Sequence, residues 1–564
     1  MLEVPLRLPG PVELSRHSTM PSSRPWFLLC LALTFGVHTD SVVAGNSTSR
    51  NVVRIKIFHT NDIHGYISGR TSDHVRTGGL PLLAGVLNRE RYRSKKLGEV
   101  NLYVDAGDLF KGTPVVDATS GRCMIDLLNQ LGLDAFALGN HEFDYGVPNL
   151  DEALDEAKFP ILAANLHCPS GLLTEIKPSV LFEFPGVTIG IVGVLTEDTP
   201  QVTSATDFHG ATFSDPIVAA REEAASLRKQ GADIVIGLSH LGMSADIDLI
   251  KKVETLDGVI GGHTHNLLER PIFIKRDHGQ RVFVAQAGAY AQNLGWISLI
   301  FDPKAKQILS VKGGVIRLDQ AGLEPNRKVA DKVEEYEAPI REIMEQPIGE
   351  LAESLGVGRR GLSSPIGEMV AEAMRVVGKG DFAFANYGGF RRPLEKGKLI
   401  REDIHTLMPF GNKVVKLRMY GKDIREMLDR MISGIWVPVP DEQQTEGSDL
   451  PGGQPILLPD ASTPGFLVGA GLTVTFDPRL PPRKRRCQIA TPKSPFDDGK
   501  IYTVIVADFL ARGGDGFTEF TRARSHREMD FVCRDAFEKY IKTHAPLSPL
   551  STRSIINLSA EPTR

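Results

Sequence analysis

Short apolar runs alternate with amphipathic stretches from residue 52 to residue 302, and this alternation predicts a layered α/β domain. Five of the runs read as strands, at 55–58, 102–104, 135–138, 234–236 and 259–260. Residues 80–97 and 214–230 carry apolar side chains at three- and four-residue spacing, which predicts helices. The second helix has a clear start, because Pro216 follows the capping residues Ser214 and Asp215. Two later apolar runs predict further strands, at 282–285 and 294–301.

Each of the five runs is followed directly by polar residues of the kinds that bind metal ions. These residues are Asp62, His64, Asp108, Asn140, His240, His263 and His265. In open α/β sheets, ligands bind outside the carboxyl ends of the strands, so we expect all seven side chains on one edge of one sheet. Asp62 and His64 alternate with Ile63, and an extended backbone would therefore send both side chains to the same side.

Each motif has an ordinary structural explanation when it is taken alone. Asp105 and Asp108 could form a strand-end turn, and a single histidine such as His240 is more often a core or surface residue than a ligand. Five such motifs in this order, ending with His263 and His265 behind a double glycine, are not explained by turns alone. Imidazole and carboxylate ligands together suit zinc, manganese or iron better than calcium. The set is what a two-metal hydrolase needs.

The second half of the chain predicts another α/β unit. Residues 326–344 are charged, with apolar side chains at helical spacing, and read as a helix that connects two domains. The unit that follows opens with a helix at 365–377 and continues with short strands at 414–419 and 472–476. Residues 437–463 are rich in Pro, Gly, Asp and Gln, which predicts a long surface loop.

Length and composition fit a secreted protein of two domains. The 564 residues exceed what one hydrophobic core supports, and a net charge of −4 gives no basic footprint for nucleic acid. The apolar run at 26–37 is too short to span a bilayer, and with Arg24 before it and small residues after it we expect a signal peptide cleaved after Ala44. Met20 is an alternative start that would give a signal of normal size. No hydrophobic tail of a GPI signal ends the chain, so we expect a soluble protein without a membrane anchor.

Several features concern the covalent processing of such a chain. Sequons at Asn46 and Asn557 predict glycosylation. Four cysteines follow the signal and permit two disulfides in three connectivities, of which a Cys487–Cys533 pair is the simplest. The basic run at 483–486 reads either as a solvated hairpin tip or as a processing site for a furin-type protease.

The polar motifs resemble those of the calcineurin-like metallophosphoesterases. The strings Thr60-Asn61-Asp62-Ile63-His64-Gly65 and Gly139-Asn140-His141-Glu142-Phe143-Asp144 resemble the 5′-nucleotidase branch in particular. The resemblance extends from residue 52 to about residue 545 and implies a four-layer metallophosphoesterase domain joined by a helix to a smaller α/β substrate-binding domain. The expected parts are a signal peptide at 1–44, a catalytic domain at 51–325, a linker helix at 326–348, a substrate-binding domain at 349–546 and a flexible tail at 547–564.

The resemblance also implies two divalent metal ions, with zinc as the first choice and manganese, cobalt or magnesium as alternatives. Asp62, His64 and His265 would bind the first ion, although some relatives carry Gln or Asn at the position of His265. Asn140, His240 and His263 would bind the second, and Asp108 would bridge the two. His141 would act beside the phosphoryl group, with Asp144 holding its orientation and keeping it protonated.

The second domain would supply specificity for a nucleotide. Asn386, Arg391 and Arg360 lie in segments that resemble substrate-binding segments of the family. Phe410 and Phe509 would stack on the two faces of the nucleobase, and Asp515 would bind the ribose hydroxyls. Without the resemblance, the two phenylalanines would read as core residues.

These observations predict a secreted metal-dependent 5′-nucleotidase that hydrolyses nucleoside 5′-monophosphates, AMP foremost, with a water activated by two metals. An apyrase acting on ATP and ADP, or a UDP-sugar hydrolase, would share every motif. A protein that only sequesters nucleotides is the alternative outside the enzymes, and the presence of both His141 and Asp144 argues against it. The expected partner is a nucleotide substrate, and the sequence leaves open whether the protein forms a homodimer.

Overall fold

The computed structural model describes residues 52–72, 75–203, 207–276, 279–319, 322–358, 364–433, 465–477, 480, 484–492, 494–551 and 553–557. The predicted signal peptide, the sequon at Asn46, Arg360 and the predicted loop at 437–463 lie outside this part of the chain. Among the described residues, no helix is both long and apolar enough to cross a membrane.

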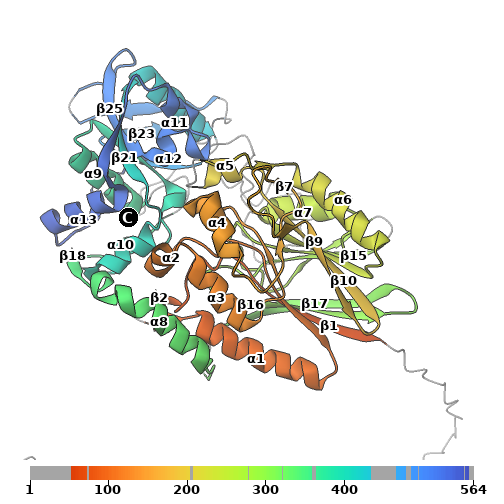
Figure 1. Ribbon diagram of the computed structural model, residues 1–564. Helices are drawn as coiled ribbons and strands as arrows, with labels where there is room; N and C mark the ends of the chain where they lie inside the picture. Colours follow the sequence, from red (N-terminus) through yellow and green to blue (C-terminus); the bar gives the residue numbers. More distant parts are fainter. Residues whose placement is uncertain are drawn as a thin grey trace, which may run out of the picture. The chain divides into compact units, whose positions relative to one another are not determined.

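Two stacked β-sheets form the centre of the N-terminal half (Figure 1). The first sheet has seven strands in the order β17 (Gln307–Arg317), β16 (Asn293–Asp302), β1 (Val53–Thr60), β4 (Val100–Asp105), β5 (Ala135–Ala137), β6 (Ile161–Leu162) and β8 (Ile176–Lys177). The second sheet has six strands in the order β14 (Ile272–Lys275), β15 (Arg281–Ala285), β13 (Gly258–Gly261), β12 (Ile234–His240), β10 (Val187–Leu195) and β9 (Ser179–Phe184).

Alternation of side chains along β1 shows how the layers are held together. Ile55 and Ile57 point between the sheets, where they join a buried cluster with Ile189 and Ile236 of the second sheet. Phe58 points the other way, into a cluster formed with helices α1 (Leu80–Lys96) and α3 (Arg122–Leu131). Helices α6 (Pro216–Lys229) and α7 (Met243–Lys252) cover the outer face of the second sheet in the same manner. The result is the predicted four-layer domain.

The expectation that the polar motifs line one edge of one sheet is wrong. Strands β1, β4 and β5 belong to the first sheet, whereas β12 and β13 belong to the second. Strands buried on both faces are continuous apolar runs in either sheet. Their sequences therefore do not show which of the two sheets each strand joins.

Helix α8 (Arg327–Met344) follows the N-terminal half and confirms the helix expected from residue 326 onwards. Its first turn is capped by Asn326, whose Oδ1 accepts from the backbone N–H of Val329 at 3.2 Å. Val329 and Val333 pack into the same cluster as α1 and α3, and Tyr336 donates from its hydroxyl to Asp126 at 2.7 Å. The helix is therefore fastened along its first half to the N-terminal domain.

A smaller α/β unit follows α8. Its sheet has five strands in the order β22 (Leu467–Ala470), β19 (Phe382–Asn386), β25 (Ile501–Ala507), β21 (Lys413–Tyr420) and β26 (His526–Val532). Its main helices are α9 (Pro365–Gly378), α11 (Gly421–Ser433) and α13 (Cys533–His544), and they share one buried hydrophobic cluster with the sheet.

Shorter elements complete the described structure. The short helices are α2 (Pro114–Thr119), α4 (Val147–Leu154), α5 (Thr199–Val202), α10 (Arg401–Leu407) and α12 (Asp508–Ala511). The short strands are β2 (Arg70–Ser72), β3 (Val75–Thr77), β7 (Leu166–His167), β11 (Thr212–Phe213), β18 (Pro347–Leu351), β20 (Gly397–Ile400), β23 (Thr473–Phe476), β24 (Gln488–Ala490) and β27 (Ile555–Asn557). The sequon asparagine Asn557 therefore ends a strand that pairs with β23, rather than lying in a flexible tail.

The four cysteines that the structure describes are not paired, so the expected Cys487–Cys533 disulfide is wrong. Cys487 lies next to Asp429, whose Oδ1 accepts from its backbone N–H at 2.7 Å. Cys533 begins α13, and its N–H donates to the carbonyl of Asn412 at 2.9 Å. Burial raises the pKa of both thiols to about 12, which makes them poorly reactive.

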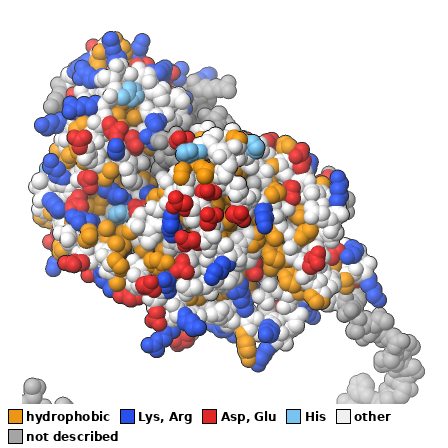
Figure 2. Space-filling model, in the orientation of Figure 1, with side chains coloured by type: hydrophobic (Ala, Val, Ile, Leu, Met, Phe, Trp, Pro, Cys, Tyr) orange, Lys and Arg blue, Asp and Glu red, His pale blue; other side chains and the backbone are white. Residues whose placement is uncertain are grey.

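The basic run is not uniformly solvated. Arg485 is 4% exposed, and its guanidinium donates to the carbonyls of Leu480 at 3.0 Å and Ile432 at 3.1 Å. Elsewhere charges are mixed: on the face drawn in Figure 2, acidic side chains gather near the middle, with Lys and Arg scattered around them.

Candidate metal centre and substrate cleft

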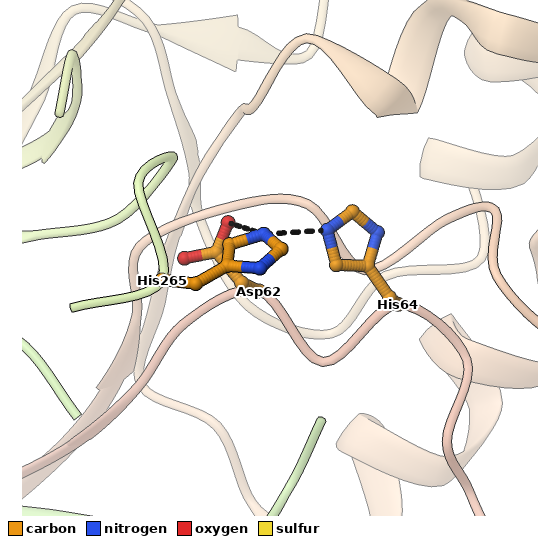
Figure 3. A group of neighbouring side chains, drawn as sticks. All are labelled: Asp62, His64 and His265. Atoms are coloured by element: carbon orange, nitrogen blue, oxygen red, sulfur yellow. Dashed lines mark hydrogen bonds and ion pairs between the residues drawn. The ribbon is translucent and has the colours of Figure 1, made fainter. Parts of the chain in front are cut away.

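Asp62, His64 and His265 form a first group of potential metal ligands, with one ligand atom from each within 4.8 Å of the others. Figure 3 shows the imidazole of His265 between the carboxylate of Asp62 and the ring of His64. Oδ1 of Asp62 lies 3.3 Å from Nε2 of His265, which in turn lies 3.1 Å from Nε2 of His64.

The backbone that presents Asp62 and His64 is not extended, contrary to the expectation from their spacing. Both residues have left-handed conformations, with φ of 52° and 49°. Their N–H groups donate to the carbonyls of Gly107 at 2.8 Å and Asp108 at 2.9 Å. These hydrogen bonds tie the loop after β1 to the loop after β4, and the curled chain still brings both side chains to one place.

Asp108, His240 and His263 form a second group of potential ligands within the same limit of 4.8 Å. Oδ1 of Asn140 lies 3.0 Å from Nδ1 of His263, which adds the fourth predicted ligand to this group. Oδ2 of Asp108 lies 3.0 Å from Nε2 of His240 and 3.8 Å from Nε2 of His64. Asp108 therefore reaches both groups, as a bridging ligand must.

The ring orientations fit two divalent ions. Nδ1 of His64 donates to the carbonyl of Lys111 at 3.1 Å, and Nδ1 of His240 donates to that of Ala106 at 2.6 Å. Each of these bonds leaves Nε2 directed at the carboxylates, which is the usual arrangement of a metal-binding histidine. Burial lowers the pKa of His64 well below its usual value, so its ring is neutral, as a ligand must be.

His240 lies beside Asp108 where a cation would bind, with its Nε2 3.0 Å from Oδ2 of the carboxylate. Burial lowers the pKa of His240, but Asp108, Asp62 and the carbonyl of Ala106 together raise the pKa to about 10. Metal binding at such a site replaces the proton, because ligand histidines must be deprotonated. The donor set thus suits zinc, manganese or a similar divalent ion.

His141 and Asp144 form a hydrogen-bonded pair beside these groups. Nδ1 of His141 lies 2.7 Å from Oδ2 of Asp144, and Oδ1 of Asp144 accepts from the hydroxyl of Thr203 at 2.6 Å. The N–H of His141 donates to Oδ1 of Asp108 at 2.9 Å. Burial alone would lower the pKa of His141, but Asp108 and Asp144 raise it above its usual value. The ring is oriented and able to hold a proton near neutral pH.

A pocket of about 190 Å³ connects this centre to the second domain. Its lining residues are Asp108, Asn140, His141, Val202, Thr203, His263, His265, Asn386, Gly388, Arg391, Phe410, Asn412, Phe509 and Asp515. The pocket thus brings together five of the six residues that the sequence assigns to substrate binding. The sixth, Arg360, lies outside the described residues.

The rings in the pocket are held by close contacts. The Phe410 ring centre lies 5.5 Å from that of His141 and 5.2 Å from the guanidinium carbon of Arg391. The Phe509 ring packs against Gly514, where an added Cβ would come within 2.5 Å of the ring. Glycine at 514 therefore makes room for Phe509.

Sequence reasoning assigned no role to Glu142, although it lies within a recognised motif. Its buried carboxylate accepts from the N–H groups of Asp108 at 3.0 Å, Leu109 at 2.6 Å, Phe110 at 3.1 Å and Gly139 at 2.6 Å. Burial, then the charge of Asp108, raises the pKa of Glu142 to about 7. Glu142 fixes the loops that carry the bridging aspartate and His141. The only sign of this role in the sequence is the glutamate between His141 and Phe143. The backbone groups that it binds at Asp108, Leu109 and Phe110 are far from it in the chain and come near only on folding.

Comparison with known proteins agrees with this architecture. Residues 55–267 match the family model for calcineurin-like phosphoesterases, and residues 347–522 match that for the 5′-nucleotidase C-terminal domain. A snake venom 5′-nucleotidase from Gloydius brevicauda is 26% identical over 562 residues, which cover 92% of this chain and 89% of that protein. A 5′-nucleotidase from Mus musculus is 27% identical over 509 residues, which cover 82% of this chain and 83% of that protein.

Solved structures give the same result. A 5′-nucleotidase precursor from Thermus thermophilus is 25% identical, with a TM-score of 0.79, and the match covers 90% of this chain and 100% of that one. The sulfate thiohydrolase SoxB of Thermus thermophilus shares the fold at a TM-score of 0.72 and 16% identity, with 90% of this chain and 97% of that one covered. The fold therefore serves more than one chemistry, and the site must decide the substrate.

The fold and the site define a calcineurin-like phosphoesterase that carries a 5′-nucleotidase C-terminal domain. The chain belongs to the 5′-nucleotidase family and is an enzyme of the phosphoesterase type.

Proposed function

We propose that the protein hydrolyses nucleoside 5′-monophosphates, with AMP as the preferred substrate, to a nucleoside and phosphate. The observation that carries this proposal is a single pocket that is lined by Asp108 and His141 of the metal centre and also by the rings of Phe410 and Phe509. A phosphate group and a nucleobase need different partners, and this pocket offers charged and polar groups together with two aromatic rings.

The residues divide the work by chemistry. The nucleobase stacks between the rings of Phe410 and Phe509, which recognise any base by its π-face. Asp515 accepts from the ribose hydroxyls, and Asn386 contacts the nucleoside from the same pocket. Arg391 binds the phosphate, because its guanidinium reaches the histidine beside the metal groups.

The catalytic domain supplies the groups for cleavage. Two divalent cations held by the seven ligands would neutralise the phosphate oxygens and activate the attacking water. His141 donates a hydrogen bond from Nε2 to an oxygen on which negative charge develops. Asp144 keeps the ring in the orientation that places Nε2 in the pocket, and it favours the protonated form.

We also propose that the protein is secreted as a soluble glycoprotein after removal of residues 1–44. The apolar run at 26–37 and the sequon at Asn46 support this part of the proposal. The test is N-terminal sequencing of protein recovered from the medium of expressing cells, where Gly45 is expected as the first residue.

Phosphate release from AMP, ADP, ATP and a UDP-sugar tests the proposed activity. The purified protein is assayed with added zinc or manganese and with a chelator control. We expect AMP to be strongly favoured. Release from ATP and ADP with AMP left intact would replace the proposal with an apyrase, and cleavage of the UDP-sugar alone with a nucleotide-sugar hydrolase. Tight AMP binding without any release would indicate a sequestering protein.

A further inference from the structure

Asp117 lies on α2, where the catalytic domain meets the second domain. Its Oδ1 accepts from Nζ of Lys111 at 2.7 Å and from the hydroxyl of Tyr145 at 2.6 Å, both in the catalytic domain. Its Oδ2 lies 3.5 Å from Nη1 of Arg534 and 3.4 Å from Nε2 of His405, both in the second domain. One carboxylate thus contacts both domains.

Arg534 holds the loop that presents Phe410. Its Nη1 donates to the carbonyl of Met408 at 3.3 Å and to that of Pro409 at 3.1 Å. These two carbonyls directly precede Phe410 in the chain. The position of the Phe410 ring therefore depends on where the guanidinium of Arg534 is held.

On its other side, Asp117 connects to the metal centre through Lys111. Lys111 lies three residues after Asp108, and its carbonyl accepts from Nδ1 of His64 at 3.1 Å. Its ammonium group binds Asp117 with a side chain that is 9% exposed. A continuous series of contacts therefore runs from His64 to the loop that carries Phe410.

The electrostatic balance makes Asp117 necessary to this arrangement. The side chains of Asp117 and Arg534 are each 18% exposed, so water screens their attraction only in part. Lys111 and Arg534 are both cations, and Asp117 is the carboxylate that lies between them. Removal of its charge leaves two cations facing each other at the domain boundary.

We propose that the Asp117–Arg534 ion pair positions the Phe410 side of the nucleobase site relative to the metal centre. Both are positioning residues, since neither lines the pocket. The inference rests on the proposed nucleotidase function, because it requires a substrate that has a base. The inference adds two residues that fix the position of the base site relative to the metal centre.

The test compares AMP with ribose 5-phosphate, which keeps the phosphate and the sugar but lacks the base. The variants are Asp117→Asn, Arg534→Gln, Arg534→Lys and the double variant Asp117→Asn/Arg534→Gln, each in the full-length protein. Glu152→Gln is the matched control, because Glu152 pairs with Arg122 entirely within the catalytic domain. Thermal unfolding monitored by circular dichroism shows that each variant is folded.

For Asp117→Asn and Arg534→Gln we expect KM for AMP to rise about tenfold, while kcat/KM for ribose 5-phosphate stays within about twofold of wild type. The double variant should be no more impaired than Arg534→Gln alone, because loss of Arg534 already removes its ion pair with Asp117. In Arg534→Lys, KM for AMP should rise less, since a lysine keeps the positive charge but not the several N–H donors of the guanidinium. In Glu152→Gln, the kinetic constants for both substrates should equal those of the wild type.

Unchanged AMP kinetics in a folded Asp117→Asn protein would overturn the inference. Equal losses with both substrates would overturn it too, because Asp117 would then act on the metal centre and not on the base site. If Asp117→Asn does not fold, the kinetics of Arg534→Lys with AMP and with ribose 5-phosphate test the inference in its place. Wild-type protein that releases phosphate from neither substrate would refute the proposed function itself, which keeps the two failures distinct.

Discussion

Arg391 of the second domain meets His141 of the catalytic domain, with Nη2 of the arginine 3.1 Å from Nε2 of the histidine. Because Nδ1 of His141 donates to Asp144, Nε2 of the neutral ring accepts from Arg391. Once His141 is protonated, two donors face each other across this short distance. An anion with several oxygens can accept from both, so the contact marks the place of a phosphate group.

Replacing Asp144 with Asn should shift the pH dependence of turnover. Asp144 helps to raise the pKa of His141. In the proposed mechanism the protonated ring is the active form. Activity is therefore present below this pKa and lost as pH rises through it. In Asp144→Asn the alkaline limb of kcat should move to lower pH, with kcat at pH 8 reduced by about 100-fold. The measurement is kcat against pH for both proteins, and coincident alkaline limbs would contradict the assignment.

Loss of a ligand from the second group should remove one metal ion and leave the other. We expect about two ions per chain in the wild type and about one in His240→Ala, counted by mass spectrometry of the purified protein. Activity should disappear with a chelator and return with zinc or manganese. His265→Gln is the matched comparison, and it should keep more activity than His240→Ala because glutamine still offers an oxygen ligand. Full metal content in His240→Ala would show that His240 is not a ligand.

Truncation of either ring of the base site should weaken AMP binding. Stacking contributes about 1–3 kcal/mol per base, which corresponds to a rise in KM of roughly 5- to 150-fold for Phe410→Ala or Phe509→Ala. Ribose 5-phosphate serves as the control, and its kinetics should not change. A similar loss with both substrates would mean that the rings support the fold of the pocket and do not contact a base.

The free energy of unfolding should fall in mild acid because of His405. Burial and the nearby Arg534 lower the pKa of His405 from 6.5 to about 3. Since the folded-state pKa is the lower one, the stability from neutral His405 is complete above pH 6.5 and is lost as pH falls towards 3. At pH 5 this amounts to about 2 kcal/mol.

Urea unfolding at pH 7 and pH 5 measures this effect, with His405→Gln as the control that cannot titrate. Between the two pH values the variant should lose about 2 kcal/mol less than the wild type. Equal losses would show that the ring of His405 is protonated as readily in the folded protein as in the unfolded chain.

The sequence reveals the candidate metal ligands better than it reveals the residues that hold them in place. Asp62 or His263 can be found because each follows an apolar run, and the end of a strand is visible in the chain. Asp117 and Glu142 cannot be found in this way, because their partners are backbone groups or side chains that only the folded structure brings near. The left-handed backbone at Asp62 and His64 likewise depends on hydrogen bonds to the loop after β4.

The strands themselves are predicted well where they are apolar and bounded. Residues 102–104 lie within β4, and 282–285 within β15. The sheet that each strand joins could not be predicted, since β1 and β12 are both buried and apolar. The predicted disulfide failed for a related reason: spacing along the chain does not show that Cys487 lies beside Asp429 of α11, whereas Cys533 begins α13.

Each group of potential metal ligands takes residues from both sheets of the N-terminal domain. Asp62 and His64 follow β1 of the first sheet, and His265 follows β13 of the second; Asp108 and His240 are divided in the same way. A cation bound at either position would link the two sheets, and its binding free energy would add to the free energy of unfolding. A chain without such ions would lose this link between the sheets as well as the chemistry that the ions supply. Metal supply would then set how long the enzyme survives as well as how fast it works.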